Sequence, residues 1–206
     1  MTTTHSPVAT LRTPRLILRQ WRTGDRQPFA ALNADPQVME HFPALLSREQ
    51  SDAMADRIQA LIEERGWGFW AAEHLASGEF MGFIGLHTPA ASLPLSPCVE
   101  IGWRLARPFW GQGLASEGAR AALEHGFSTL HLESIVSFTA LSNLRSQAVM
   151  QRLGMERDAH DFDHPQVPAG HALRRHCLYR LTHAQWLQQQ AMACLLYTSD
   201  AADDLL

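Results

Sequence analysis

Lysine is missing from this chain of 206 residues, and all 17 of its Lys and Arg positions are arginine. The absence excludes three classes of enzyme, because P-loop nucleotide hydrolases, pyridoxal phosphate enzymes and protein kinases each depend on a lysine. An excess of positive charge is missing as well, since the formal net charge is −4. Nucleic-acid-binding proteins present clustered cations, so we do not expect DNA or RNA as a partner.

Cysteine is scarce, and the three present, Cys98, Cys177 and Cys194, form no Cys-x-x-Cys pair. We therefore expect neither a disulfide framework nor a thiolate zinc site, which fits a reducing compartment. Long apolar runs are missing too: no window approaches roughly 18 consecutive apolar residues, and the N-terminus lacks the basic and apolar regions of a signal peptide. The resulting expectation is a cytoplasmic protein without a membrane segment.

The residues that are present fit one folded domain. Hydrophobic residues make up 46% of the chain and charged residues 18%, and a chain of this size buries a single core. Alternation at 68–74 and 80–87 predicts an antiparallel hairpin, whereas two strand-loop-helix units at 99–127 and 134–153 predict parallel strands. The expected fold is therefore α/β (α+β) with a mixed sheet. Further elements are expected as strands at 15–21, 154–157 and 173–181 and as helices at 24–34, 47–66 and 182–190, the second helix beginning with the capping box Ser47-Arg-Glu-Gln50.

The two ends of the chain carry no signal for an element that such a domain needs. We expect residues 1–10 to form a flexible N-terminus. Residues 195–206 contain three of the acidic side chains and match no expected strand or helix. We interpret this tail as disordered or as an artefact at the end of the sequence.

The motif Trp110-Gly-Gln-Gly-Leu-Ala-Ser116 lies between a predicted strand and a predicted helix. A glycine-rich turn that leads into a helix exposes backbone N–H groups and the positive helix end, which bind phosphate without a cation. Such glycines also occur for turn geometry alone, and that alternative stays open. A dinucleotide fingerprint is disfavoured, because its third glycine would fall at Ser116.

The stretches at 99–118 and 143–155 together resemble the GNAT superfamily of N-acetyltransferases, and most closely its Rim-type branch of ribosomal-protein N-terminal acetyltransferases. The runs at 13–19 and 179–186 are similar to that branch too, so the resemblance covers about residues 11–187. It implies a single domain with a splayed, mostly antiparallel sheet of about seven strands and flanking helices. It also implies transfer of an acetyl group from acetyl-CoA to a primary amine by direct attack in a ternary complex.

The resemblance further implies how acetyl-CoA binds, between the fourth and fifth predicted strands. The pyrophosphate would lie on the backbone of the 110–116 turn, and the pantetheine would pair with main chain near Trp103. The family motif has Gln or Arg where this chain has Trp110, which puts a side-chain role at that position in doubt. The expected cofactor-binding residues are Trp103, Leu105, Trp110, Gly111, Gln112, Gly113, Leu114, Ala115, Ser116 and Asn143.

An acceptor amine is mostly protonated at neutral pH, so its reaction needs a group that takes a proton. We predict that Glu100 is this general base, directly or through a water, because burial in an apolar strand raises the pKa of a carboxyl group. The alternatives are a glutamate that faces outward or one that pairs with Arg104.

The departing thiolate needs a proton donor, and the tyrosine that many superfamily members use is replaced here by Met150. We assign the role to Ser146 in Asn143-x-x-Ser146, although a serine in a first helical turn often satisfies only local backbone groups. Asn143 is the expected N-cap of that helix.

Two alternative functions stay open beside this one. A catalytically silent CoA-binding module would keep the phosphate turn without the chemistry. A metal-dependent hydrolase would use the histidine-rich loop, but His160-x-x-x-His164 and His171-x-x-x-x-His176 do not match a zinc-protease motif, so we expect no metal. The acceptor is expected to be a protein N-terminal α-amine or a small-molecule amine, and the chain a monomer or a homodimer.

Overall fold

The computed structural model describes residues 7–203, with side chains described for residues 7–193. Parts of the predicted flexible N-terminus (1–6) and of the predicted tail (204–206) lie outside the described residues. The strands are β1 (Leu11–Arg12), β2 (Leu16–Arg19), β3 (Phe69–His74), β4 (Phe80–His87), β5 (Glu100–Leu105), β6 (Ser134–Ala140), β7 (Glu156–Arg157), β8 (Phe162–Asp163) and β9 (Arg175–Thr182). The helices are α1 (Arg26–Asn33), α2 (Arg48–Arg65), α3 (Leu114–Glu124), α4 (Leu144–Arg152) and α5 (His183–Asp203).

One mixed sheet runs through the molecule in the order β1-β2-β3-β4-β5-β6-β9-β7, with β8 paired to β9. The predicted mixed sheet is confirmed, since β5 and β6 are parallel and the neighbouring pairs are antiparallel. The sheet has nine strands instead of about seven. The two additional strands, β1 and β8, are two residues long, which is too short for periodicity in the sequence to reveal them.

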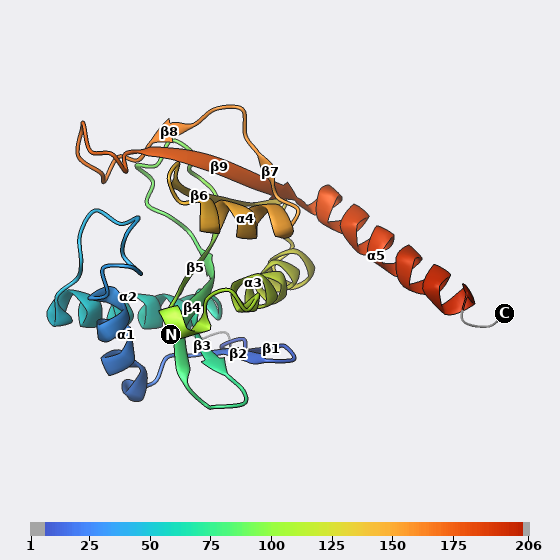
Figure 1. Ribbon diagram of the computed structural model, residues 1–206, viewed down its shortest axis with the longest axis horizontal. Helices are drawn as coiled ribbons and strands as arrows, with labels where there is room; N and C mark the ends of the chain where they lie inside the picture. The colour runs from blue at the N-terminus through green and yellow to red at the C-terminus, as the bar shows by residue number, and fades with distance from the viewer. Residues whose placement is uncertain (1–6, 204–206) are drawn as a thin grey trace, which may run out of the picture.

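The helices largely follow the sequence signals. Helix α2 begins with the predicted capping box, in which Ser47 accepts from the amide of Gln50, and ends at Gly66 in the left-handed conformation. Helix α3 ends at Glu124, and the chain continues as a π-helical turn over His125–Thr129. The predicted helix therefore changes type in its last turn. Helix α5 continues to Asp203, well beyond the predicted end at residue 190, and projects away from the sheet (Figure 1).

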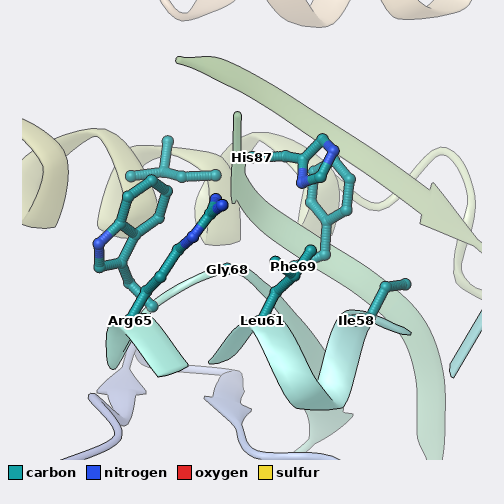
Figure 2. A pocket seen from close by; sticks show the side chains of 8 residues that line it. Ile58, Leu61, Arg65, Gly68, Phe69 and His87 are labelled. Carbon is teal, nitrogen blue, oxygen red and sulfur yellow. The ribbon is translucent and has the colours of Figure 1, made fainter. Parts of the chain in front are cut away.

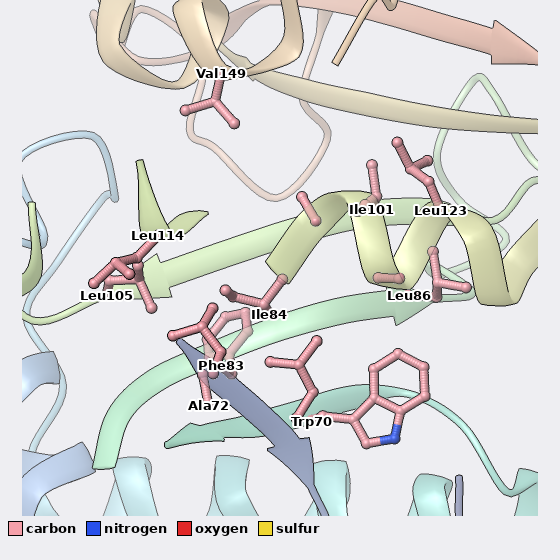
Figure 3. Packing of buried hydrophobic residues seen from close by; sticks show 14 of the residues in the cluster. Trp70, Ala72, Phe83, Ile84, Leu86, Ile101, Leu105, Leu114, Leu123 and Val149 are labelled. Atoms are coloured by element: carbon pink, nitrogen blue, oxygen red, sulfur yellow. The ribbon is translucent and has the colours of Figure 1, made fainter. Parts of the chain in front are cut away.

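The main core lies between the β2–β5 part of the sheet and helix α3 (Figure 3). Side chains from the two sides, including Ile84, Ile101 and Leu114, are almost completely buried there. Gly118 allows this close packing, because a Cβ at that position would lie 2.5 Å from Cδ1 of Ile84 and 3.2 Å from Cδ1 of Leu16. The core therefore fixes α3, and with it the turn that precedes α3, against β5.

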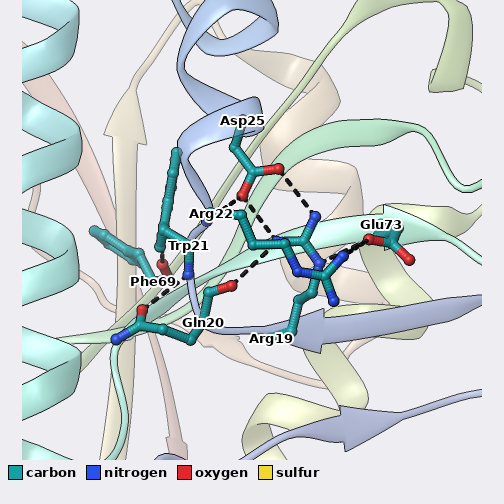
Figure 4. Close-up of polar contacts among 7 residues, drawn as sticks. All are labelled: Arg19, Gln20, Trp21, Arg22, Asp25, Phe69 and Glu73. Carbon is teal, nitrogen blue, oxygen red and sulfur yellow. Dashed lines mark hydrogen bonds and ion pairs between the residues drawn. The ribbon is translucent and has the colours of Figure 1, made fainter.

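A buried ion pair fixes the start of α1 to the sheet (Figure 4). The guanidinium of Arg19 donates to both carboxylate oxygens of Asp25, at 2.8 and 2.9 Å, and also donates to Glu73 at 2.7 Å. Arg19 and Asp25 are 6% and 3% exposed, so water cannot replace either partner. Arg22 reaches Glu73 from solvent, with 63% of its side chain exposed.

Replacing Asp25 with Ala leaves the buried charge of Arg19 without its bidentate partner. We expect the free energy of unfolding to fall by about 3–5 kcal/mol, measured by urea denaturation. The matched change Arg22→Ala removes an exposed arginine from the same network and should cost less than about 1 kcal/mol. Equal losses for the two variants would contradict this role of the buried pair.

None of the helices within residues 7–203 combines the length and the apolar character that crossing a membrane requires.

Candidate active site

Strands β5 and β6 separate soon after they meet, which opens a gap in the middle of the sheet. The amide of Val136 donates to the carbonyl of Val99 at 2.9 Å, and the only paired positions of the two strands in the described part of the chain are Glu100 and Val136. One step further, the hydroxyl of Ser137 donates to the carbonyl of Ile101 at 3.0 Å. A side chain thus replaces a main-chain bond where the gap begins.

The main chain of Trp103 faces this gap. In a strand, the N–H and C=O groups of alternate residues point to the same neighbour. The carbonyls of Val99 and Ile101 point towards β6, whereas Ala106 donates to Met81 on the other side. The N–H and C=O groups of Trp103 and Leu105 consequently point towards β6, at positions where β6 has moved away.

Leu105 offers fewer main-chain groups to a ligand than we predicted. Its carbonyl accepts a hydrogen bond from the indole Nε1 of Trp110 at 2.7 Å, so only its N–H remains open to the gap. The guanidinium of Arg145 lies over the Trp110 ring, 4.7 Å from the ring centroid. Trp110 therefore connects the end of β5 to the first turn of α4 and holds the two sides of the gap together.

The turn before α3 has the conformation that the glycine motif suggests. Gly111 and Gly113 have φ angles of +73° and +76°, which residues other than glycine rarely adopt. Gly113 is the N-cap of α3 and offers no side-chain cap, and the amide of Glu117 makes the bond to its carbonyl at 3.0 Å. This is the first hydrogen bond of the helix. The amides of Leu114, Ala115 and Ser116 come before it in the chain, so they have no carbonyl acceptor within α3 and are the donors that the helix N-terminus offers to an anion.

The side chains of the turn point back to the protein. Gln112 donates through Nε2 to the carbonyl of Pro108 at 2.7 Å, and Ser116 is 4% exposed, with its hydroxyl 3.5 Å from Nη1 of Arg152. Main-chain groups are thus the atoms that this turn can offer to a ligand.

Two arginines next to the turn were not recognised from the sequence. Arg15 donates to the carbonyl of Gln112 at 2.9 Å and forms an ion pair with Glu117 at 2.6 Å, while 47% of its side chain stays exposed. Arg145 lies on the other side, over Trp110. Both are far in sequence from the glycines, so no local pattern connects them to the turn.

Glu100 lies where β5 and β6 meet, at the closed end of the gap. It is partly buried, and this burial raises the pKa of its carboxyl group to about 8. His87 is directly opposite on β4, and burial lowers the pKa of that imidazole. No ion pair joins Glu100 to Arg104 among the residues that the structure describes, so the alternative of such a pair is wrong.

Asn143 and Ser146 lie at the start of α4, beside β6. Asn143 is the N-cap, as predicted: its Oδ1 accepts from the amide of Ser146 at 3.2 Å. Its Nδ2 donates to Thr139 Oγ1 at 2.9 Å and to Ser146 Oγ at 3.1 Å. Because Ser146 Oγ accepts this bond, its own proton is available to donate. Met150, at the position of the missing tyrosine, is buried in the core.

Two hollows border helix α2 and differ greatly in size. The crevice between α2 and the β3–β4 hairpin (Figure 2), bordered by Arg65, Phe69 and His87, has a volume of about 10 Å³, which suffices for one water molecule. The second measures about 470 Å³ and lies between α2, the loop from α1 to α2, and Arg104 of β5. Only the second can hold an organic substrate.

The histidine-rich loop forms no cluster of metal ligands. No group of three His, Cys, Asp or Glu residues with suitable geometry occurs in the described part of the chain. The rings of His164 and His176 lie with their centroids 4.9 Å apart, tilted by 41° to each other, and pack against Phe138 and Phe162. Their packing accounts for these two histidines without a metal.

Comparisons with known proteins agree with one another. A family model described as an acetyltransferase (GNAT) domain matches residues 15–156. FsC-acetyl coenzyme A-N(2)-transacetylase of Aspergillus fumigatus is 30% identical over 188 residues, 88% of this chain and 79% of that protein. The uncharacterized protein YkkB of Bacillus subtilis is 32% identical over 148 residues, 70% of this chain and 84% of that protein. Among solved structures, the ribosomal L7/L12 alpha-N-protein acetyltransferase RimL, in complex with coenzyme A, has a TM-score of 0.67 at 18% identity, covering 84% of this chain and 98% of that chain.

Proposed function

Since this chain belongs to the GNAT acetyltransferase family, we propose that it moves the acetyl group of acetyl-CoA to a primary amine, either a protein N-terminal α-amine or the amine of a small molecule. The observation that carries the proposal is the gap between β5 and β6, which leads from Glu100 past the open main chain of Trp103 to the amides in the first turn of α3. The gap offers hydrogen bonds to an extended ligand with an amide-containing arm and a phosphate end.

The main chain supplies most of the binding in this proposal. The pyrophosphate of acetyl-CoA accepts hydrogen bonds from the amides of 114–116, where the positive end of α3 favours an anion. The pantetheine arm pairs with the N–H and C=O groups of Trp103, as a further strand would. Arg15 and Arg145 flank this path and supply the positive charge that lysine supplies in other phosphate sites.

The chemistry then needs two proton transfers. The amine nitrogen forms a bond to the thioester carbon, and its proton goes to the carboxylate of Glu100, directly or through a water. The carbon–sulfur bond breaks as the tetrahedral intermediate collapses, and the thiolate takes the proton of Ser146 Oγ, so that coenzyme A leaves as a thiol. Glu100 then releases its proton to solvent and Ser146 recovers one from solvent, which restores both groups for the next turnover. The raised pKa of Glu100 suits the first transfer, because a base near the operating pH holds the proton well without being fully protonated.

The relatives give the proposal indirect support. One carries coenzyme A in its structure, and another is named for transfer from an acetyl coenzyme A. Their acceptors differ, since one name refers to a ribosomal protein and the other to FsC, so the names leave the acceptor class of this chain open.

Replacing Ser146 with Ala tests the proton donor. We expect kcat to fall by up to about 10², at the low end of the effect of a general acid, because a thiolate is a better leaving group than an amide nitrogen. The amide of Ser146 keeps its bond to Asn143, so thermal unfolding should change little. The matched change Ser77→Ala alters an exposed serine of the β3–β4 turn and should leave kcat unchanged; equal kcat for Ser146→Ala and the wild type would remove Ser146 from the mechanism.

The proposal as a whole is tested by incubating the protein with acetyl-CoA and a panel of peptides and small amines. The expected result is release of free thiol together with a mass increase of one acetyl group on the amine. If acetyl-CoA raises the melting temperature but no amine is acetylated, the chain is a silent CoA-binding module and the proposal is wrong. If acetyl-CoA neither binds nor reacts, both hypotheses fail.

A further inference from the structure

The cavity of about 470 Å³ has the size of a small-molecule site, since such sites measure roughly 300–1,000 Å³. It is formed by α2 and the loop between α1 and α2 on one side and by the side chain of Arg104 on the other. Most of its walls are apolar side chains: Met39, Phe42, Pro43, Leu46 and Met54.

Arg104 is a buried cation without an anionic partner. The residue is 8% exposed, and its Nη1 donates to the neutral Asn33 Oδ1 at 2.6 Å. Its Nε has no hydrogen-bond partner, and no carboxylate lies within ion-pair distance of it in the part of the chain that the structure describes. Burial lowers the pKa of Arg104 to about 10, which still leaves it charged at neutral pH.

The surroundings of Arg104 make its buried charge energetically unfavourable unless a ligand supplies an anionic partner. The ring of Phe42 lies 4.0 Å and that of Phe83 5.4 Å from the guanidinium carbon, so aromatic faces cover it in place of water. A buried charge that lacks both water and a counter-ion is unfavourable. A guanidinium with open donors matches the two oxygens of a carboxylate in a bidentate pair.

The electrostatics of the cavity favour a negative ligand. Its lining contains two arginines, Arg57 and Arg104, and no aspartate or glutamate. An ammonium group would be repelled from this end, so an acceptor that enters must turn its amine away from Arg104.

The cavity also lies beside the proposed reaction centre. Arg104 follows Trp103, whose main chain faces the gap, and lies on the same face of β5 as Glu100 because the two are four residues apart in the strand. The loop that forms the outer wall reaches the segment before α4, since the hydroxyl of Ser142 lies 3.3 Å from Nδ1 of His41. A ligand held by Arg104 can therefore direct a second group towards the thioester.

We propose that this cavity binds the carboxylate of a small acceptor amine, an amino acid or related amino-carboxylate with an apolar side chain, and that Arg104 is its counter-ion. The inference rests on the proposed function and narrows its acceptor class. The apolar walls take the side chain, the carboxylate pairs with Arg104, and the amine points towards the gap. A peptide N-terminus, which carries an amide in place of this carboxylate, would leave Arg104 unpaired.

The test compares acids with amides on the protein loaded with coenzyme A. The probes are N-acetyl-L-methionine, N-acetyl-L-leucine and N-acetyl-L-phenylalanine, each with its carboxamide, so that no amine pKa differs within a pair. Calorimetric titration should show at least one acid that binds tenfold or more tightly than its amide. Equal binding within every pair, or no binding by any acid, would overturn the inference.

Variants then locate the preference. Arg104→Gln should abolish the difference between acid and amide, and Arg104→Lys, which keeps the charge but loses the fork of donors, should keep only part of it. Arg48→Gln is the matched control, because Arg48 is an exposed arginine of α2 that does not line the cavity. A preference that survives in Arg104→Gln would overturn the assignment, and the acid–amide comparison in the wild type decides the matter even if that variant does not fold.

The failure of this inference and the failure of the proposed function give different results. Coenzyme A binding is measured first on the wild type, and its absence would contradict the proposed function. Coenzyme A binding together with equal affinity for acids and amides would contradict only the carboxylate site. Acetylation of peptides but of no amino acid would likewise contradict the carboxylate site and leave the acetyltransferase in place.

Discussion

Replacing Glu100 with Gln lowers kcat/KM for acetyl transfer by about two to four orders of magnitude, the range expected for loss of a general base. The variant should fold, because burial raises the pKa of Glu100 to about 8 and the side chain is mostly protonated, and thus neutral like glutamine, at pH 7. Affinity for acetyl-CoA should also stay unchanged, since the groups that we propose to bind it are on the main chain of Trp103 and of the turn. A loss of kcat/KM accompanied by loss of acetyl-CoA binding would contradict the assignment.

The pH dependence provides a sharper form of this test. The base must be ionised, so activity should rise with pH as the carboxyl group loses its proton, with a midpoint at about 8 in the free enzyme. An acceptor whose amine is neutral over the whole pH range removes the titration of the amine itself from the profile. With such an acceptor, kcat/KM of the wild type should rise between about pH 6 and 9, because Glu100 ionises around a midpoint of about 8, whereas the Gln variant should show a flat profile. The same rise in both proteins would assign it to another group.

The double change Gly111→Ala and Gly113→Ala weakens acetyl-CoA binding. Each glycine has a left-handed φ angle, +73° and +76°, and a side chain there costs about 1–2 kcal/mol. If the turn relaxes in the free protein, binding must restore the strained conformation, and affinity falls by about five- to thirtyfold for each substitution. Calorimetric titration with acetyl-CoA measures this loss.

Gly78→Ala is the matched control for this double change. Gly78 has a similar φ angle of +70° with no atoms near the position of its Cβ, and it lies in the β3–β4 turn, away from the gap. It should lose a comparable amount of stability per substitution but keep its affinity for acetyl-CoA. A similar loss of affinity in Gly78→Ala would mean that general destabilisation, and not the altered conformation of the 110–116 turn, explains the weaker binding.

The parts of the fold that the sequence predicts well depend on local patterns. The β3–β4 hairpin follows from alternation and a glycine turn, and the ends of α2 follow from the capping box at Ser47 and the left-handed Gly66. Strands β1 and β8 escape prediction because two residues carry no period, and they exist only through pairing with β2 and β9. The extension of α5 lacks a clear end signal in the sequence, since no glycine or proline interrupts it.

In the candidate site, too, the features encoded by neighbouring residues can be predicted from the sequence, and those that depend on distant contacts cannot. The turn at 110–116 can be predicted because its glycines and the helix that follows are contiguous, and the cap at Asn143 because its spacing to Ser146 is local. Arg15 and Arg145 reach the turn from distant parts of the chain. Arg104 is visible in the sequence only as a possible partner of Glu100, and its burial without a counter-ion depends on contacts from α1 and from the loop after it.

The contact of coenzyme A with the main chain of β5 and of the turn before α3 is central to the proposed function. Amide NMR of the wild-type protein, titrated with coenzyme A, observes these groups directly. We predict that the largest shifts occur at the N–H groups of Trp103, Leu105 and residues 114–116, and that they saturate together. Saturating coenzyme A that leaves these amides unchanged, or that shifts mainly amides remote from the gap, would contradict this mode of binding and the function built on it.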